Sequence, residues 1–420
     1  MDQPQVAPYG SWESPITSEL IVAHTVRLMQ MALDGVDTYW IELRPTEEGR
    51  NVIVRRPPAG ASEDVTPSPF NARSRVHEYG GGAYLVAGDV VYFTNFTDQR
   101  LYRQLLHGEP EPMTPDAPLR FADMILDTPR DRIICVREDH RASEREAVAS
   151  LVAIDLRRGG EGEVLVSGHD FYSSPRLSPD GARLAWLAWD HPNMPWDGTE
   201  LWVAEVMQDS SLVNRQRVAG GPEESIFQPE WSPDGTLYFV SDRSGWWNIY
   251  RQRAGKNELV HERAAEFGQP QWVFGRSTYG FESAERIICT FLEAGRSYLA
   301  ALDTATSELH TINIPYDVIE AVRVAPGRAV LRAGSPTEPT SIVEVRLPSG
   351  EIELLRRSSE TRIDPTYLSV PEAVEFPTRD GRAAHAFYYA PQNPDYTGAT
   401  GEKPPLIVMA HGGPTGAVSP

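Results

Sequence analysis

Four consecutive residues, His411, Gly412, Gly413 and Pro414, have the composition of a turn that can stabilise an oxyanion. They follow residues 406–410 (LIVMA), an uninterrupted apolar run typical of a strand that is covered on both faces. A glycine-rich turn after such a strand brings a backbone N–H close to the carbonyl oxygen that becomes negatively charged in acyl transfer, because no Cβ blocks the approach. The alternative is a plain strand-to-loop turn without chemistry.

The serine that such a turn would serve is not found in the sequence. An activated serine stands on a sharp turn of the form Gly-x-Ser-x-Gly, and none of the 420 residues forms this pentapeptide. Residues 275–277 and 295–297 (both GRS) lack the closing glycine, and we reject both as nucleophile sites.

Other candidate residues are acidic. Glu78 lies in the segment HEYGGG (77–82), and its carboxylate could neutralise a free substrate amine. The interpretation we favour is a glycine-rich turn that lets a strand bend, with Glu78 satisfied locally. Glu223 and Glu224 form a second acidic pair, which we interpret as part of a solvated loop.

We expect no metal site and no cofactor. The sequence has no His-Glu-x-x-His pattern, and its two cysteines, Cys135 and Cys289, have no paired spacing of metal-ligand or disulfide type.

The elements that position these residues repeat along the chain. The turn SPDG at 178–181 recurs at 232–235, 54 residues later, and Pro-Asp-Gly is typical of a hairpin turn. The segment QPEW (228–231) is echoed by QPQW (269–272). The chain therefore contains a repeated unit of about 50 residues, which is the size of a four-stranded propeller blade.

Seven segments with alternating apolar and polar residues follow this interval. Their starts are 62, 50, 50, 47, 50 and 44 residues apart. They are YWIELR (39–44), LYRQLL (101–106), LVAIDL (151–156), LWVAEV (201–206), NIYRQR (248–253), YLAALD (298–303) and IVEVRL (342–347). A β-sandwich would not keep one period over more than 300 residues, so we predict seven blades. The ten tryptophans recur at strand positions, where packing between sheets explains them.

Charge limits the partners. The net charge of −20, with no run of Lys or Arg, would repel phosphate backbones and anionic lipids, so neither nucleic acid nor a membrane is an expected partner. No basic leader precedes an apolar stretch, and no apolar run approaches the roughly 18 residues of a membrane span. With two cysteines only, the composition indicates a soluble protein of the cytoplasm.

The pattern changes after about residue 366. Residues 373–377 and 383–390 predict a hairpin with an Arg-Asp-Gly turn, followed by a polar loop at 391–405 and the apolar run 406–410. We expect three parts: residues 1–24, an N-terminal extension with a short helix at 16–23 capped by Thr17 or Ser18; residues 25–365, an all-β, seven-bladed propeller; and residues 366–420, the first strands of an α/β-hydrolase domain. The last part would be incomplete, because such a domain needs about 150 to 250 residues.

The seven repeats and the segment LIVMAHGGP (406–414) resemble the prolyl oligopeptidase family of serine peptidases. PYGSWESPIT (8–17) and RVHEYGGGAY (75–84) resemble its acylaminoacyl-peptidase and dipeptidyl-aminopeptidase-like members. The resemblance covers essentially the whole chain. It implies that Gly413 contributes a backbone amide to the oxyanion hole, that Gly412 and His411 shape the turn, and that the catalytic Ser, Asp and His follow after Pro420.

The resemblance also implies a function. The complete enzyme would hydrolyse short peptides by acyl transfer to serine, and the propeller would restrict access to the site on the C-terminal hydrolase domain of the same protein. The 420 residues alone should be inactive. The number of subunits stays open, with a homo-oligomer among the alternatives. The competing hypothesis is a stand-alone propeller that binds a partner without catalysis.

Overall fold

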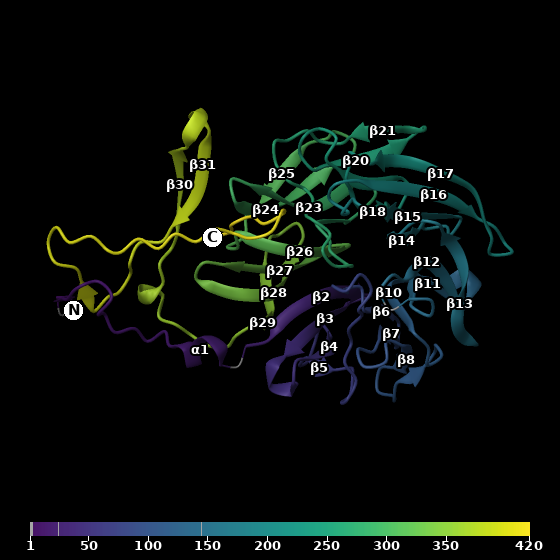
Figure 1. The fold of residues 1–420 in the computed structure, drawn as a ribbon, viewed down its shortest axis with the longest axis horizontal. Helices are drawn as coiled ribbons and strands as arrows, with labels where there is room; N and C mark the ends of the chain where they lie inside the picture. Colours follow the sequence, from purple (N-terminus) through teal and green to yellow (C-terminus); the bar gives the residue numbers. More distant parts are fainter. Residues whose placement is uncertain (1–2, 24, 144) are drawn as a thin grey trace.

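The computed structural model describes residues 3–23, 25–143 and 145–420. In this part of the chain, seven four-stranded antiparallel sheets are arranged around a common axis (Figure 1). Each sheet is formed by four consecutive strands, so the chain completes one blade before it begins the next. The predicted seven-bladed propeller is therefore confirmed.

The blades are numbered in chain order. Their strands are β2 (Arg27–Asp34), β3 (Asp37–Arg44), β4 (Arg50–Arg56) and β5 (Glu63–Asp64) in blade 1; β6 (Tyr84–Ala87), β7 (Val90–Thr94), β8 (Leu101–Leu105) and β9 (Glu111–Pro112) in blade 2; β10 (Leu119–Asp127), β11 (Arg132–Asp139), β12 (Val148–Asp155) and β13 (Gly159–Ser167) in blade 3; β14 (Phe171–Leu177), β15 (Arg183–Trp189), β16 (Thr199–Val206) and β17 (Leu212–Gly221) in blade 4; β18 (Ile226–Trp231), β19 (Leu237–Ser241), β20 (Asn248–Arg253) and β21 (Lys256–Leu259) in blade 5; β22 (Tyr279–Phe281), β23 (Arg286–Glu293), β24 (Arg296–Asp303) and β25 (Leu309–Ile312) in blade 6; and β26 (Val318–Ala325), β27 (Arg328–Ser335), β28 (Glu338–Arg346) and β29 (Ile352–Arg357) in blade 7.

The first strand of each blade faces the axis. β2 contacts β6 and β26, and β10 contacts β6 and β14, so these strands meet around the centre of the ring. Short 3₁₀ helices interrupt the connections at η1 (Pro45–Glu47) and η2 (Thr128–Arg130).

The core is divided among the junctions between blades. Each of the seven junctions encloses its own cluster of buried apolar side chains, because each sheet buries both faces against its neighbours. Trp186 and Trp231 belong to such clusters, as predicted. Trp246 does not: 44% of it is exposed, so the assignment of every tryptophan to the core was wrong.

The predicted repeat was correct in six blades and out of phase in one. The segments at 101, 151, 201, 248, 298 and 342 all begin or fall in the third strand of a blade, whereas residues 39–44 form β3, the second strand of blade 1. The equivalent third strand is β4 (RNVIVRR), which restores an interval of roughly 50 residues. Both SPDG turns connect the first and second strands of their blades. QPEW lies in β18, but QPQW lies in the connection before β22 and forms no strand.

The terminal segments lie beside the ring. The short helix α1 (Ser18–Val22) begins after Thr17, whose side chain accepts a hydrogen bond from the Leu20 N–H at 3.1 Å, so Thr17 is the N-cap. The strands β30 (Glu372–Pro377) and β31 (Ala383–Tyr388) form the predicted hairpin around η4 (Arg379–Gly381), and the hairpin projects away from the blades (Figure 1). β1 (Gln5–Val6) pairs in parallel with β32 (Tyr396–Thr397), and η3 (Pro365–Tyr367) precedes the hairpin.

The apolar run 406–410 does not form the predicted strand. It pairs with no strand in the described residues, and Leu406, Ile407, Val408 and Met409 are 76 to 87% exposed. A strand needs a neighbour to satisfy its N–H and C=O groups, and none adjoins this segment.

None of the helices in the described ranges has the length and apolar character needed to cross a bilayer.

Candidate functional site

The turn at 411–416 has a compact backbone. Gly413 adopts φ of 74°, which only glycine takes up without strain. A Cβ on Gly416 would lie 2.3 Å from the Gly412 carbonyl oxygen and 2.6 Å from Nδ1 of His411, so a side chain cannot fit there. Gly416 is thus a residue of the turn that sequence reasoning missed. The signal available was a third glycine soon after Pro414.

The predicted oxyanion donor is the backbone N–H of Gly413, and Gly412 is predicted to shape the turn. Among the hydrogen bonds of the described residues, none uses the N–H of Gly412 or Gly413 as donor. His411 is exposed and lies beside Gly416, which agrees with a role in shaping the turn. The roles assigned to these three residues stay predictions.

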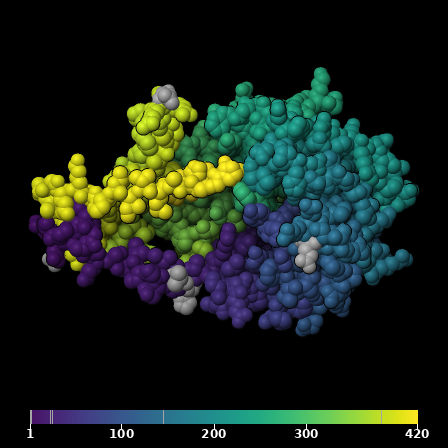
Figure 2. Space-filling model, in the orientation of Figure 1, coloured from purple at the N-terminus to yellow at the C-terminus, as the bar shows by residue number. Residues whose placement is uncertain are grey.

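Trp272 holds this segment against the propeller. Its indole N–H donates a hydrogen bond to Oγ1 of Thr415 at 2.8 Å. The ring centroid of Trp272 lies 5.3 Å from that of Tyr79 and 4.4 Å from that of Trp196. The yellow C-terminal segment in Figure 2 runs from the side of the molecule toward the middle of the ring. The turn therefore lies on the face of the propeller that also carries Tyr79.

The glycines of the segment 77–82 are required by close packing. Gly80, Gly81 and Gly82 all have positive φ, and added Cβ atoms would approach the backbones of Ser74, Phe274 and Asp123 within 2.1, 2.5 and 2.8 Å. The Phe274 N–H donates to the Gly80 carbonyl at 3.0 Å, and the Asp123 N–H donates to the Gly82 carbonyl at 2.9 Å. The first bond links the connections that lead into blades 2 and 6, which lie far apart around the ring, and the second links the connection into blade 2 to β10 of blade 3.

Glu78 is both locally paired and accessible. Its carboxylate accepts a hydrogen bond from Nη1 of Arg120 at 2.6 Å, and Arg75 lies 3.9 Å away. The side chain is still 67% exposed. The hydrogen bond from Arg120 lowers the pKa of Glu78, so the group is a carboxylate at neutral pH. The local pairing matches the interpretation that the sequence favoured, and the exposure leaves room for a ligand amine.

His77 lies beneath this surface. Its ring packs edge-on against Phe171 and Trp189 and tilted against Phe274, with centroids 4.7 to 5.4 Å apart. Nε2 is buried and has no hydrogen-bond partner among the described residues. Burial lowers the pKa of His77 to about 3, so the ring is neutral in the folded protein.

The remaining sequence candidates serve the fold. Glu224 is not part of a solvated loop: it accepts hydrogen bonds from the hydroxyl of Ser241 at 2.6 Å and from Nε of Arg243 at 2.8 Å. Ser277, one of the two rejected serines, is 2% exposed and bonded to the backbone of Tyr279. We therefore assign Glu224 and Ser277 to the fold and not to a catalytic site. In the described ranges no three His, Cys, Asp or Glu side chains are grouped so that they could hold a metal ion.

Structures of known proteins share this architecture. The structure of a puromycin-hydrolysing peptidase of Mycobacterium tuberculosis matches with a TM-score of 0.91 and 36% sequence identity, over 99% of this chain and 66% of that one. A crystal structure of puromycin hydrolase gives the same TM-score, identity and coverage. Prolyl oligopeptidase B from Galerina marginata matches with a TM-score of 0.65 and 13% identity, over 88% of this chain and 55% of that one, which shows a common fold alone.

These matches concern part of each protein. The chain spans just under two thirds of the length of the two structures that are 36% identical to it. No family model and no curated protein matches the sequence.

Proposed function

Because the chain belongs to the prolyl oligopeptidase family of serine peptidases, we propose that it is the N-terminal, propeller part of an enzyme that hydrolyses short peptides. The reaction would be acyl transfer to a serine followed by hydrolysis. The two structures at 36% identity are those of a puromycin-hydrolysing peptidase and a puromycin hydrolase, so puromycin is the first substrate to test.

The observation that carries this proposal is the position of the 411–416 turn. The hydrogen bond between Trp272 and Thr415 holds the turn against the face of the propeller that carries Tyr79. The N–H of Gly413 has no acceptor among the described residues and would stabilise the tetrahedral oxyanion. A donor of this kind contributes about 10² to 10³ in kcat in other acyl-transfer enzymes. The serine, aspartate and histidine would come from residues outside this chain.

The propeller would select substrates by size. The hydrogen bond between Phe274 and Gly80 joins the connections into blades 2 and 6 across the ring, and a link of this kind on the face that carries the turn supports a filtering role. Glu78 supports a substrate with a free amine, because an ionised and largely exposed carboxylate lies on the same surface as Tyr79. This favours the dipeptidyl-aminopeptidase type over the acylaminoacyl type.

A fluorophosphonate probe, which labels activated serines, tests the proposal. We expect no labelling of the 420-residue chain, and labelling together with puromycin hydrolysis when the chain is extended by the coding sequence after Pro420. Labelling of the 420-residue chain would contradict the assignment of the nucleophile. An extended protein without labelling would favour the stand-alone scaffold.

The turn can be tested in the same extended protein. Gly416→Ala places a Cβ against Gly412 and His411, so we expect kcat to fall about tenfold or more. Gly221→Ala is the matched control, because no atom lies within 4 Å of the added Cβ and the φ of Gly221 is not positive. Equal activity of the two variants would remove the turn from the mechanism.

A further inference from the structure

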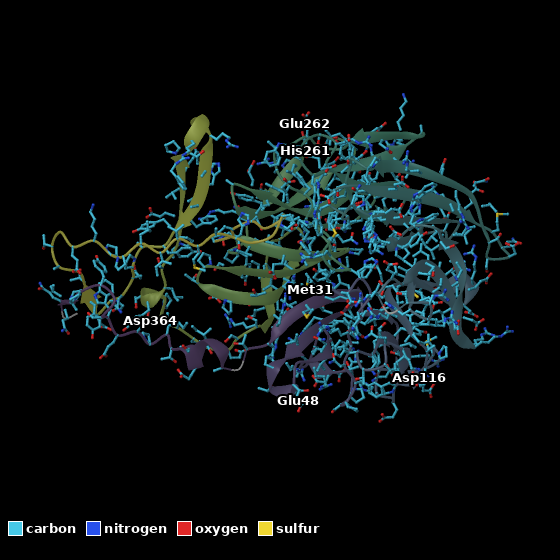
Figure 3. All side chains as sticks on the ribbon, viewed as in Figure 1. Met31, Glu48, Asp116, His261, Glu262 and Asp364 are labelled. Carbon is cyan, nitrogen blue, oxygen red and sulfur yellow. The ribbon has the colours of Figure 1, made fainter. Side chains whose placement is uncertain are left out.

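A cavity of about 330 Å³ opens on the face of the propeller that carries Tyr79. It is bounded by the first strands of blade 1, by β26 and β27 of blade 7, and by the connections that lead into blades 2 and 6. Met31, labelled in Figure 3, lies on the wall formed by β2. The volume of the cavity is at the small end of the range found for ligand-binding pockets.

The lining of this cavity is strongly basic. Five guanidinium groups and a single carboxylate contribute to it: Arg27, Arg73, Arg276, Arg323, Arg332 and Glu320. The cavity lining is thus positively charged, although the whole chain has a net charge of −20. A concave surface of one sign concentrates counter-ions of the other sign.

Among the described residues, one of the five arginines has a carboxylate at ion-pair distance. Nε of Arg332 lies 2.7 Å from Oε2 of Glu320. Arg323 donates to backbone carbonyls instead, to Met31 at 3.0 Å and to Gly275 at 2.6 Å. Carbonyl oxygens accept these hydrogen bonds without carrying a formal charge, and no carboxylate of the described residues lies at ion-pair distance from Arg323.

The other three arginines have spare capacity. Arg276 donates through Nη1 to Oε1 of Gln269 at 2.7 Å, while its Nε is buried and has no hydrogen-bond partner in the described part of the chain. Within the described ranges, neither Arg27 nor Arg73 has a carboxylate at ion-pair distance, and Arg73 stacks over Phe96. Burial, followed by the positive charge of Arg332, lowers the pKa of Arg276; Glu320 acts in the opposite direction and Arg27 in the same direction.

The cavity is connected to the 411–416 turn, which we propose to be part of the active site. Tyr79 forms part of its wall, packs against Trp272, and is thereby connected to Thr415 of the turn. Apolar side chains such as Met29 and Val273 complete the lining. A peptide that reaches the turn could place a charged end here, with its apolar part along the wall.

We propose that this cavity binds a carboxylate of the peptide substrate, through Arg27 and Arg276. The planar guanidinium fork pairs with a carboxylate through two hydrogen bonds, and an incoming anion relieves the repulsion among the arginines. The carboxylate is either the C-terminal group of the peptide or an acidic side chain. The inference rests on the proposed peptide substrate.

Calorimetric titration of the 420-residue chain tests this proposal without any hydrolysis. The ligands are acetyl-Ala-Ala with a free carboxylate, the same peptide with a C-terminal amide, and amidated acetyl-Ala-Glu. We expect at least one acidic peptide to bind about tenfold more tightly than the neutral amide, and this difference to shrink at high ionic strength. The two acidic peptides distinguish a C-terminal carboxylate from a side chain.

Three variants locate the site. Arg27→Gln and Arg276→Gln should each raise the dissociation constant of the acidic peptide about tenfold. Arg158→Gln, an exposed arginine in the turn between β12 and β13, should leave it unchanged. Because Arg27 is exposed, its variant should keep the thermal midpoint of the wild type even if Arg276→Gln does not.

The outcomes separate the two proposals. Equal binding of acidic and neutral peptides, no binding of either, or unchanged affinity in both arginine variants would overturn the carboxylate site. Labelling of the extended protein by fluorophosphonate would still support the peptidase in that case. Arginine-dependent binding without labelling would support the cavity and contradict the peptidase.

Discussion

The imidazole of His77 is enclosed by three aromatic rings, and this enclosure determines its protonation. Burial lowers its pKa from 6.5 to about 3, so the folded state keeps the ring neutral where the unfolded chain would bind a proton. The stabilising effect of the neutral ring is complete above about pH 6.5. It is lost as the pH falls from there toward about 3, by at most about 1.4 kcal/mol per pH unit.

The His77→Asn variant should show this linkage. Asparagine tolerates the positive φ of 55° at this position but carries no titrating ring. We expect the free energy of unfolding of the variant to depend less on pH between about 6.5 and 4, by close to one proton. Urea denaturation at several pH values measures this slope. His310→Asn is the control, because His310 is 71% exposed, and an unchanged slope in His77→Asn would contradict the argument.

Among the elements, the junction between blades 7 and 1 differs from the other six. Its buried apolar cluster is the smallest, with Leu28, Met31, Trp40, Val52, Val54, Val330 and Ile342. As at the other junctions of the described structure, no strand is shared between the two blades. Arginines of blade 7 bridge the gap instead: Arg328 donates to the Gly35 carbonyl at 3.0 Å and to the Asp37 carbonyl at 3.2 Å.

Arg328→Ala should therefore weaken the closure of the ring. The substitution removes the bonds to blade 1 and leaves their acceptors with poorer partners, which should lower the free energy of unfolding by about 1 to 3 kcal/mol. Arg346→Ala is the matched control from the same blade: its ion pair with Glu351 is exposed and should contribute less than about 1 kcal/mol. Denaturant unfolding compares them, and an equal loss would mean that the junction needs no arginine bridge.

For the whole molecule, the net negative charge and the apolar segment 406–409 have opposite effects on solubility. The net charge of −20 keeps molecules apart. The four apolar side chains at 406–409 are more than three quarters exposed and have unpaired backbone groups, which is typical of an aggregation site.

The double substitution Ile407→Ser and Val408→Ser should reduce aggregation of the 420-residue chain. Both side chains are exposed, so the thermal midpoint should stay unchanged while light scattering and binding of a hydrophobic dye decrease. Val36→Ser, in the turn between β2 and β3, removes an isolated exposed valine and should change neither signal. Scattering that persists in the double variant would place the aggregation site elsewhere.

The sequence by itself determined the number of blades and the hairpin at 372–388. Both follow from local rules: alternation places side chains on the two faces of a strand, and Pro-Asp-Gly turns join neighbouring strands. It also indicated the HGGP turn, because glycine content and the preceding apolar run are contiguous. Local patterns could not tell β3 from β4 as the equivalent strand in blade 1, since both alternate.

Only the tertiary structure decided which distant residues meet. Gly80 and Phe274 are hydrogen-bonded although 194 positions separate them, and Arg27, Arg73 and Arg276 line one cavity although they come from three parts of the chain. Such contacts depend on closure of the ring by all seven blades. No period in the sequence records which side chains face the axis at the same height, so the tertiary structure alone determines the cavity and the close packing of the glycines.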